Sequence, residues 1–147
     1  MTDHEWGFRT RALHAGARPD PTTGARAVPI FQTSSYVFED VTDAADLFAL
    51  QKYGMIYSRL GNPTVSAFEE RMASLDGALG AVAASSGHAA EFLAIATLAE
   101  AGDHIVSSSH LYGGTITMFS NTLGRFGIET TFVDPTDVDG IAAAIRP

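Results

Sequence analysis

The 147-residue sequence has no cysteine and only one lysine, and charged residues make up only 18% of it. Without cysteine the chain has no disulfide framework and no thiolate chemistry. It has no basic run and a net charge of −8, which argues against nucleic acid or an acidic membrane surface as a partner. Glu91 and Glu100 interrupt the best candidate for a membrane span, and the first residues lack the apolar segment of a signal peptide. We therefore expect a cytoplasmic protein.

From residue 79 onward, short apolar stretches of strand length alternate with segments of helical pattern. The pattern predicts strands at 79–84, 104–108 and 128–133, and helices at 88–100, 115–126 and 137–145. Strand–helix alternation with short loops predicts an α/β fold, with a parallel sheet and helices on both of its faces. In the helix over 115–126, the apolar spacing places four side chains on the buried face: Ile116, Phe119, Leu123 and Phe126.

The first 62 residues carry little periodic pattern. Short helices are predicted at 8–14 and from Asp40 or Thr42 to about residue 50, with turns and extended chain between them. Asn62 is a good helix cap, and it precedes an amphipathic helix over 63–75. We therefore divide the chain into an N-terminal arm, residues 1–62, and the first part of a larger domain, residues 63–147.

The pattern stops after the last predicted helix, with no strand to follow it. A sheet of three strands would keep an exposed edge, and the shortage of charged residues indicates surface that is covered by further chain or by a partner. We expect the strand–helix pattern to continue beyond residue 147.

A small polar turn, Ser85-Ser86-Gly87-His88, joins the strand predicted at 79–84 to the helix at 88–100. A helix start offers free N–H groups and the positive end of the macrodipole, and Gly87 allows a close approach of the backbone to a ligand. These features suit a phosphate cradle. On this stretch alone, an ordinary turn with a serine cap is the simpler interpretation.

Two further sets of residues suit an anion or a planar ligand. Tyr57 and Arg59 stand two apart in a stretch expected to be extended, so both side chains point the same way and can clamp a phosphate or carboxylate. Tyr112 follows the strand at 104–108, at the edge where ligands bind, and its ring can stack on a planar group. The alternatives are a solvated Arg59 beside a packed Tyr57, and a Tyr112 that closes the core.

Other kinds of site find less support. No histidine stands at ligand spacing from a second histidine or a carboxylate on one helix face, so no metal site is expected. The glycine patterns of nucleoside-triphosphate and dinucleotide sites are absent, as is the nucleophile elbow of hydrolases. Ser86 has no identifiable histidine–acid pair, which makes a hydrolase a weak alternative.

Several separate motifs together resemble the pyridoxal-phosphate enzymes of cysteine and methionine metabolism. They are Tyr57-Ser58-Arg59, Asn62-Pro63-Thr64, Ser85 to Ala90, Tyr112-Gly113-Gly114-Thr115 and, near the start, residues 10–16 and 29–36. Within this family, His88 and the segment 47–57 look most like the O-acetylhomoserine sulfhydrylases. The resemblance implies the start of the large domain of a fold type I transferase, with pyridoxal 5'-phosphate as cofactor. It covers roughly the first third of such an enzyme.

The resemblance also implies roles for single residues. Ser86, Gly87 and His88 would bind the cofactor phosphate, and Tyr112 would stack on the cofactor ring, with proton transfer as a further role. Tyr57 and Arg59 would reach the phosphate of a neighbouring subunit, which requires a homo-oligomer, at least a dimer and expected to be a tetramer. The implied substrate is a small amino acid, and the implied reaction is γ-replacement on O-acetyl-L-homoserine by sulfide or a thiol, which belongs to methionine biosynthesis.

Three residues that the family uses are not identifiable in this chain: the Schiff-base lysine, the aspartate that pairs with the pyridinium nitrogen and the arginine that holds the substrate carboxylate. The family holds its cofactor through a Schiff-base lysine, and the single lysine here, Lys52, matches no lysine motif of the family. We therefore expect this chain alone to be inactive. Two alternatives stay open: another activity of the same family, namely cystathionine γ-synthase, cystathionine γ-lyase or methionine γ-lyase, and a non-catalytic α/β module that binds a phosphate ligand.

Overall fold

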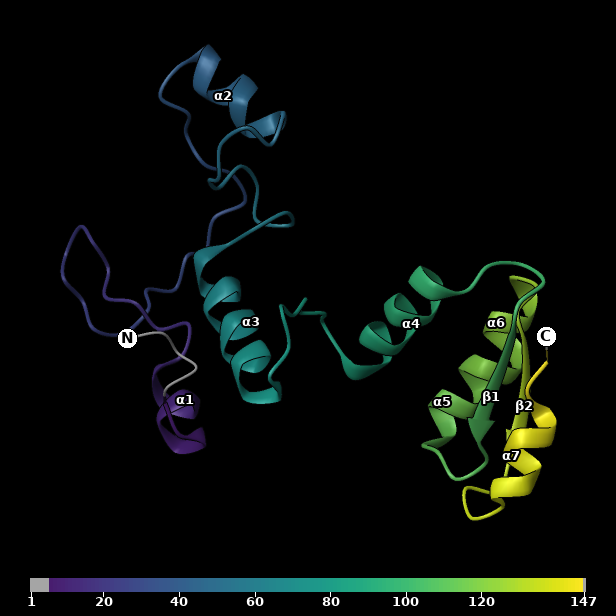
Figure 1. Cartoon of the computed structure of the whole chain (residues 1–147). Helices are drawn as coiled ribbons and strands as arrows, with labels where there is room; N and C mark the ends of the chain where they lie inside the picture. The colour runs from purple at the N-terminus through teal and green to yellow at the C-terminus, as the bar shows by residue number, and fades with distance from the viewer. Residues whose placement is uncertain (1–5, 147) are drawn as a thin grey trace. The chain divides into compact units, whose positions relative to one another are not determined.

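The computed structural model describes residues 6–146, and these fall into two compact units that divide between Ala83 and Ala84 (Figure 1). The sequence predicts a different boundary, between residues 62 and 63, where an arm that serves a neighbouring subunit would end. The structure of one chain does not test this boundary, and it stays a prediction. None of the helices within the described range is long and apolar enough to cross a membrane. The cytoplasmic location also stays a prediction.

The first unit contains three helices, α1 (Phe8–His14), α2 (Val41–Phe48) and α3 (Pro63–Asp76), which confirms the helices predicted there. Asp40 caps α2, and Asn62 caps α3 by accepting a bond from the Thr64 N–H at 2.9 Å. Gly77 ends α3 with a φ of 69°, a left-handed conformation that favours glycine. Local capping signals therefore set the ends of both longer helices.

Helix α1 packs on α3 through side chains that bind backbone carbonyls. Arg11 donates to the Ser74 carbonyl, and the Arg71 Nε donates to the Ala15 carbonyl at 3.0 Å. Gly16, at a φ of 70°, lies so close to α3 that a Cβ there would be 2.4 Å from the Ala67 carbonyl oxygen. This close approach requires glycine.

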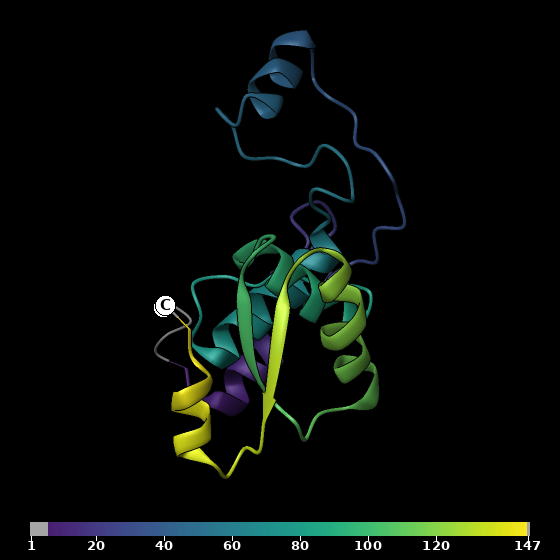
Figure 2. The same cartoon turned by 90° about the vertical axis from the view of Figure 1, so that its right-hand side faces the viewer.

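The second unit contains a two-stranded parallel sheet in which β1 (His104–Ser108) pairs with β2 (Glu129–Val133) from end to end (Figure 2). The helical elements around it are α4 (Gly87–Leu98), α5 (Gly113–Thr117), the π-helix Met118–Thr122, α6 (Leu123–Arg125) and α7 (Val138–Ala144). The strand–helix–strand order and the parallel pairing confirm the predicted α/β class.

The core of the second unit is a cluster of Met118, Leu123 and Ile128. Met118 and Leu123 are five residues apart and point inward together because the π-helix shifts the helical repeat there. The prediction that Phe126 lies on the buried face is wrong, since its side chain is 56% exposed. Phe126 is the C-cap residue of α6, so it lies where the helix ends and not on a continued helical face.

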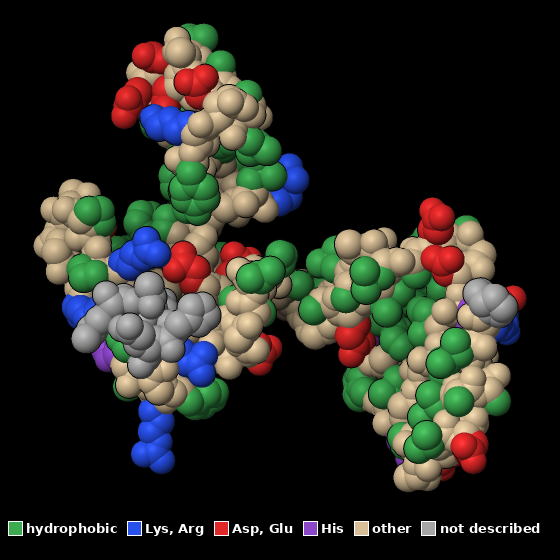
Figure 3. All heavy atoms as spheres, in the orientation of Figure 1, with side chains coloured by type: hydrophobic (Ala, Val, Ile, Leu, Met, Phe, Trp, Pro, Cys, Tyr) green, Lys and Arg blue, Asp and Glu red, His purple; other side chains and the backbone are tan. Residues whose placement is uncertain are grey.

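The strand predicted at 79–84 is also wrong, because this segment pairs with no strand among the described residues. Leu79 and Val82 are exposed, and the Ala83 N–H donates to the Glu69 carboxylate at 2.8 Å. A strand needs a neighbour to supply its hydrogen-bond ladder, and apolar composition alone does not provide one. Hydrophobic side chains lie on the surface of both units (Figure 3).

Candidate functional site

The amino end of α4 begins at the predicted polar turn. Ser86 is the N-cap, and its Oγ accepts a bond from the Ala89 N–H at 3.1 Å. The N–H groups of Gly87 and His88 find no acceptor among residues 6–146. The helix start therefore keeps two free donors at the positive end of its macrodipole, as an anion site requires.

Space next to this helix end is open. A Cβ built on Gly87 meets no atom within 4 Å, and Ser86, Gly87 and His88 are all exposed. A group the size of a phosphate can therefore approach the two free N–H groups. The serine cap and the anion site are compatible, because the Ser86 Oγ takes up the N–H of Ala89 and not those of Gly87 or His88.

The turn after β1 brings Tyr112 to the same helix end. A Cβ built on Gly114 would lie 2.7 Å from the Tyr112 Cε1 and 3.0 Å from the His88 Cε1. Both rings thus border the space that the absent side chain of Gly114 leaves. The structure brings together Tyr112 and His88, which the sequence placed in separate motifs.

The Tyr112 side chain is 78% exposed. It does not close the core, so that alternative is wrong. An exposed tyrosine ring beside a free helix end can stack on a planar ring whose charged group binds the helix end. Such a ligand can enter without a movement of the rest of the unit, because the Tyr112 ring and the start of α4 are both exposed to solvent.

A hydrogen bond that was not predicted from the sequence joins the two parts of this site. The Thr115 hydroxyl donates to the Glu91 carboxylate at 2.9 Å, and Thr115 is only 6% exposed. Glu91 is the only carboxylate in α4, a helix otherwise rich in apolar residues. That isolated charge is the signal that could have identified it.

Tyr57 and Arg59 lie in the first unit, and their side chains contact each other. The Arg59 guanidinium carbon lies 5.5 Å from the centre of the Tyr57 ring, within range of a cation–π interaction. The chain is not extended here as predicted, because the Leu60 and Gly61 N–H groups both donate to the Tyr57 carbonyl and close a turn. Arg59 is exposed and forms no ion pair with any described residue, so its guanidinium can bind an anion.

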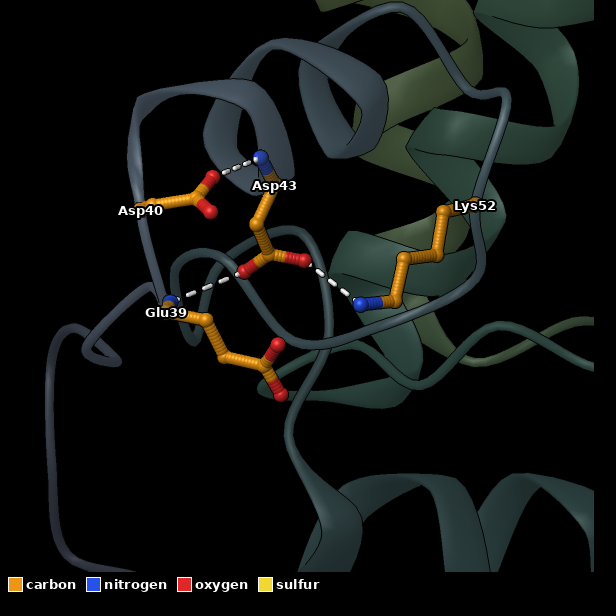
Figure 4. A network of polar contacts seen from close by, with 4 residues as sticks. All are labelled: Glu39, Asp40, Asp43 and Lys52. Carbon is orange, nitrogen blue, oxygen red and sulfur yellow. Dashed lines mark hydrogen bonds and ion pairs between the residues drawn. The ribbon is translucent and has the colours of Figure 1, made fainter.

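Lys52, the single lysine of the chain, takes part in a polar network at the start of α2. Its Nζ lies 2.6 Å from the Asp43 carboxylate, whose other oxygen accepts the Glu39 N–H at 3.0 Å (Figure 4). The hydrogen bond to Asp43, with its negative charge, raises the pKa of Lys52. A lysine that bonds covalently to a carbonyl must lose its proton, which calls for a lowered pKa. Lys52 has the opposite environment.

Comparison with known proteins gives one family. Residues 9–147 match the model described as Cys/Met metabolism PLP-dependent enzyme. The chain is similar to a sulfhydrylase from Fusarium oxysporum, at 57% identity over 94% of this chain and 32% of the relative. It is also similar to the O-acetyl-L-homoserine sulfhydrylase of Corynebacterium glutamicum, at 52% identity over 97% of this chain and 33% of the relative. The chain thus spans about a third of the length of these curated relatives.

A solved structure gives the same result for the fold. It is a Campylobacter jejuni protein assigned as an O-acetylhomoserine (thiol)-lyase, which carries N'-pyridoxyl-lysine-5'-monophosphate. The match has a TM-score of 0.90 at 40% identity and covers 96% of this chain and 34% of that one. The segment described above therefore corresponds in fold to about a third of that protein.

Proposed function

This chain belongs to the Cys/Met metabolism PLP-dependent enzymes, and on that premise we propose that the whole protein is a transferase that forms carbon–sulfur bonds. Its substrate is O-acetyl-L-homoserine, its nucleophile is sulfide or a thiol, and its product is homocysteine or methionine. The relatives named as sulfhydrylases support this choice within the family.

The observation that carries the proposal is the pairing of a free helix end with an exposed aromatic ring in the second unit. Pyridoxal 5'-phosphate has a phosphate at one end and a planar pyridine ring at the other. The N–H groups of Gly87 and His88 fit the phosphate, and Tyr112 fits the ring. The empty space at Gly87 leaves room for the phosphate oxygens.

The roles of the residues follow from this fit. Bound pyridoxal phosphate supplies an electron sink for substrate carbanions. Ser86 holds the helix start by its cap. Gly87 and His88 would donate to the phosphate through their N–H groups, with the His88 side chain as a further donor. Tyr112 would orient the cofactor ring by stacking, and its hydroxyl would serve in proton transfer. We assign the lysine that binds the cofactor covalently to a position other than Lys52, because the Lys52 Nζ pairs with the Asp43 carboxylate at 2.6 Å.

Tyr57 and Arg59 form the second part of the proposed site. An arginine with no acidic partner among the described residues, held over a tyrosine ring, is suited to clamp a phosphate by charge-assisted bonds. We place this pair at the phosphate of a neighbouring subunit, so the whole protein is a homo-oligomer, at least a dimer and expected to be a tetramer.

The first experiment supplies the whole purified protein with O-acetyl-L-homoserine and sulfide and measures homocysteine. Production of homocysteine, with a visible absorbance band of bound cofactor, is expected. Cystathionine formation from cysteine, or cleavage of cystathionine or methionine, in place of this reaction would favour the alternative activities of the family. A protein that retains a phosphate ligand but turns over none of these substrates would support the non-catalytic module.

Arg59→Ala tests the clamp in the same protein. We expect the dissociation constant for pyridoxal 5'-phosphate to rise at least tenfold, since a charged hydrogen bond contributes about 1.5–3 kcal/mol. Arg18→Ala is the matched control, because Arg18 is an exposed arginine of the same unit in a loose ion pair with Glu70 at 3.7 Å. Equal affinity in both variants would remove Arg59 from the phosphate site.

A further inference from the structure

The hydrogen bond between Glu91 and Thr115 connects the two elements that carry the candidate site. Glu91 lies in the second turn of α4, the helix that begins with Gly87 and His88. Thr115 lies three residues after Tyr112, in the first turn of α5. Its hydroxyl donates to the Glu91 carboxylate at 2.9 Å, and Thr115 and Asn62 are the buried polar residues of the described chain.

Within α5, the first backbone bond runs from the Ile116 N–H to the Tyr112 carbonyl at 3.1 Å. The helix opens with Gly113 and Gly114, and glycine has the largest conformational freedom to lose on folding. Tyr112 has no side-chain cap bond to its own helix, and its ring is mostly exposed. The hydrogen bond from Thr115 to Glu91 of α4 restricts the conformational freedom of the two glycines, next to the Tyr112 ring.

We propose that Glu91 and Thr115 are positioning residues: their hydrogen bond fixes the start of α5, and with it the Tyr112 ring, against the amino end of α4. Gly114 also contributes to this positioning, because the lack of a side chain there leaves the space that the Tyr112 and His88 rings border. This inference rests on the proposed function, since it assigns these residues to the binding of pyridoxal 5'-phosphate.

The test compares Thr115→Val with Thr115→Ser in the whole protein. Valine keeps the shape of threonine without the hydroxyl, and serine keeps the hydroxyl. We expect Thr115→Val to raise the dissociation constant for pyridoxal 5'-phosphate roughly 3- to 10-fold, the equivalent of one hydrogen bond, and to weaken the visible circular dichroism of the bound cofactor. Thr115→Ser is expected to restore both.

The control is Thr130→Val, which removes the hydroxyl of a partly buried threonine in β2 that donates to the Phe119 carbonyl at 3.4 Å. It is expected to leave affinity and circular dichroism unchanged. If Thr130→Val has the same effect as Thr115→Val, the loss reflects general stability and the positioning role is overturned.

A measurement without cofactor separates this inference from the proposed function. Amide hydrogen exchange over residues 112–116 should be faster in Thr115→Val than in the parent protein, and normal in Thr115→Ser. Unchanged exchange overturns the positioning role. A parent protein that binds no pyridoxal 5'-phosphate overturns the proposed function, and faster exchange in Thr115→Val would then still support the role of the hydrogen bond between Thr115 and Glu91.

Gly114→Ala and Gly113→Ala test the space between the rings. The Cβ of Gly114→Ala meets the exposed, movable Tyr112 ring, so cofactor affinity should fall about tenfold while the thermal midpoint stays within a few degrees of the parent. A Cβ on Gly113 meets no atom within 4 Å, so Gly113→Ala is expected to bind cofactor normally. Equal affinities in the two variants would contradict the role of Gly114.

Discussion

In the second unit, Met118, Leu123 and Ile128 pack beneath two paired strands, whereas the first unit buries mainly small or single apolar side chains. The first unit is instead held by side chains that bind distant backbone groups. Asn62 donates to the Phe31 carbonyl at 2.9 Å, and the Thr64 hydroxyl donates to the Pro29 carbonyl at 2.9 Å.

This difference shows how each unit can support a different part of the proposed site. Apolar packing is not directional and fixes a whole unit at once, which suits the helix end and the Tyr112 turn. Hydrogen bonds to a few carbonyls fix single points of an extended chain and leave the rest of it on the surface, which suits the segment that carries Tyr57 and Arg59. Substitutions can therefore test the two means of support separately.

The largest effect on stability is expected from Leu123→Ala, because Leu123 is 1% exposed and lies at the centre of the apolar cluster. We expect the free energy of unfolding to fall by about 2–5 kcal/mol, measured by urea titration with circular dichroism. Leu98→Ala, at a side chain that is 85% exposed, should cost less than about 0.5 kcal/mol. A similar cost for both would mean that the cluster is not what holds the second unit.

A smaller effect, confined to the first unit, is expected from Asn62→Ala. The change removes the cap of α3 and the two bonds that Asn62 donates to the Phe31 carbonyl and the Ser58 hydroxyl. A loss of about 1–3 kcal/mol is expected, with faster amide exchange over residues 29–36.

Asn62→Ser separates the two parts of this effect. Serine still caps the helix but cannot donate to the Phe31 carbonyl, so the start of α3 should stay protected while residues 29–36 exchange faster. If residues 29–36 stay protected in both variants, the first unit is held by something other than these polar contacts.

The second unit could be predicted from the sequence better than the first, because apolar packing leaves a pattern in the sequence and long-range hydrogen bonds do not. Apolar periodicity indicates helices and paired strands, so β1, β2 and the long helices could be predicted, and capping residues indicated the starts of α2, α3 and α4. Long-range bonds such as Asn62 to Phe31 leave no periodic pattern, and the sequence does not reveal them. The segment 79–84 shows the converse, since its composition is that of a strand but a strand also requires a neighbour.

The candidate site shows the same limits. The polar turn and Tyr112 could be picked out because small residues follow apolar stretches there. Their closeness could not, because it depends on the space at Gly114 and on the bond from Thr115 to Glu91. The predicted roles in cofactor binding stay predictions until the variants above are measured.

The smallest effect is expected from Lys52→Met, which removes the only lysine of the chain. The hydrogen bond from Lys52 is the main cause that lowers the pKa of Asp43 below its ordinary value of 3.8, so the Asp43 pKa should rise toward 3.8 in the variant. Titration of the Asp43 carboxyl carbon by NMR measures this. Lys52→Arg is the matched control and should keep the pKa low, since arginine retains the positive charge.

The ion pair between Lys52 and Asp43 also makes the stability of the protein depend on pH. Its contribution to stability is present above pH 3.8 and is lost as the pH falls through the lowered pKa of Asp43. At the alkaline end it is present below pH 10.5 and is lost as the pH rises through the raised pKa of Lys52. In Lys52→Met the alkaline dependence should disappear, and the acid dependence should weaken but not vanish, because the Glu39 N–H still lowers the pKa of Asp43. The visible band of the cofactor in the whole protein should be unchanged. Loss of that band would show that Lys52 serves the cofactor, and would overturn the assignment of the covalent lysine to another position.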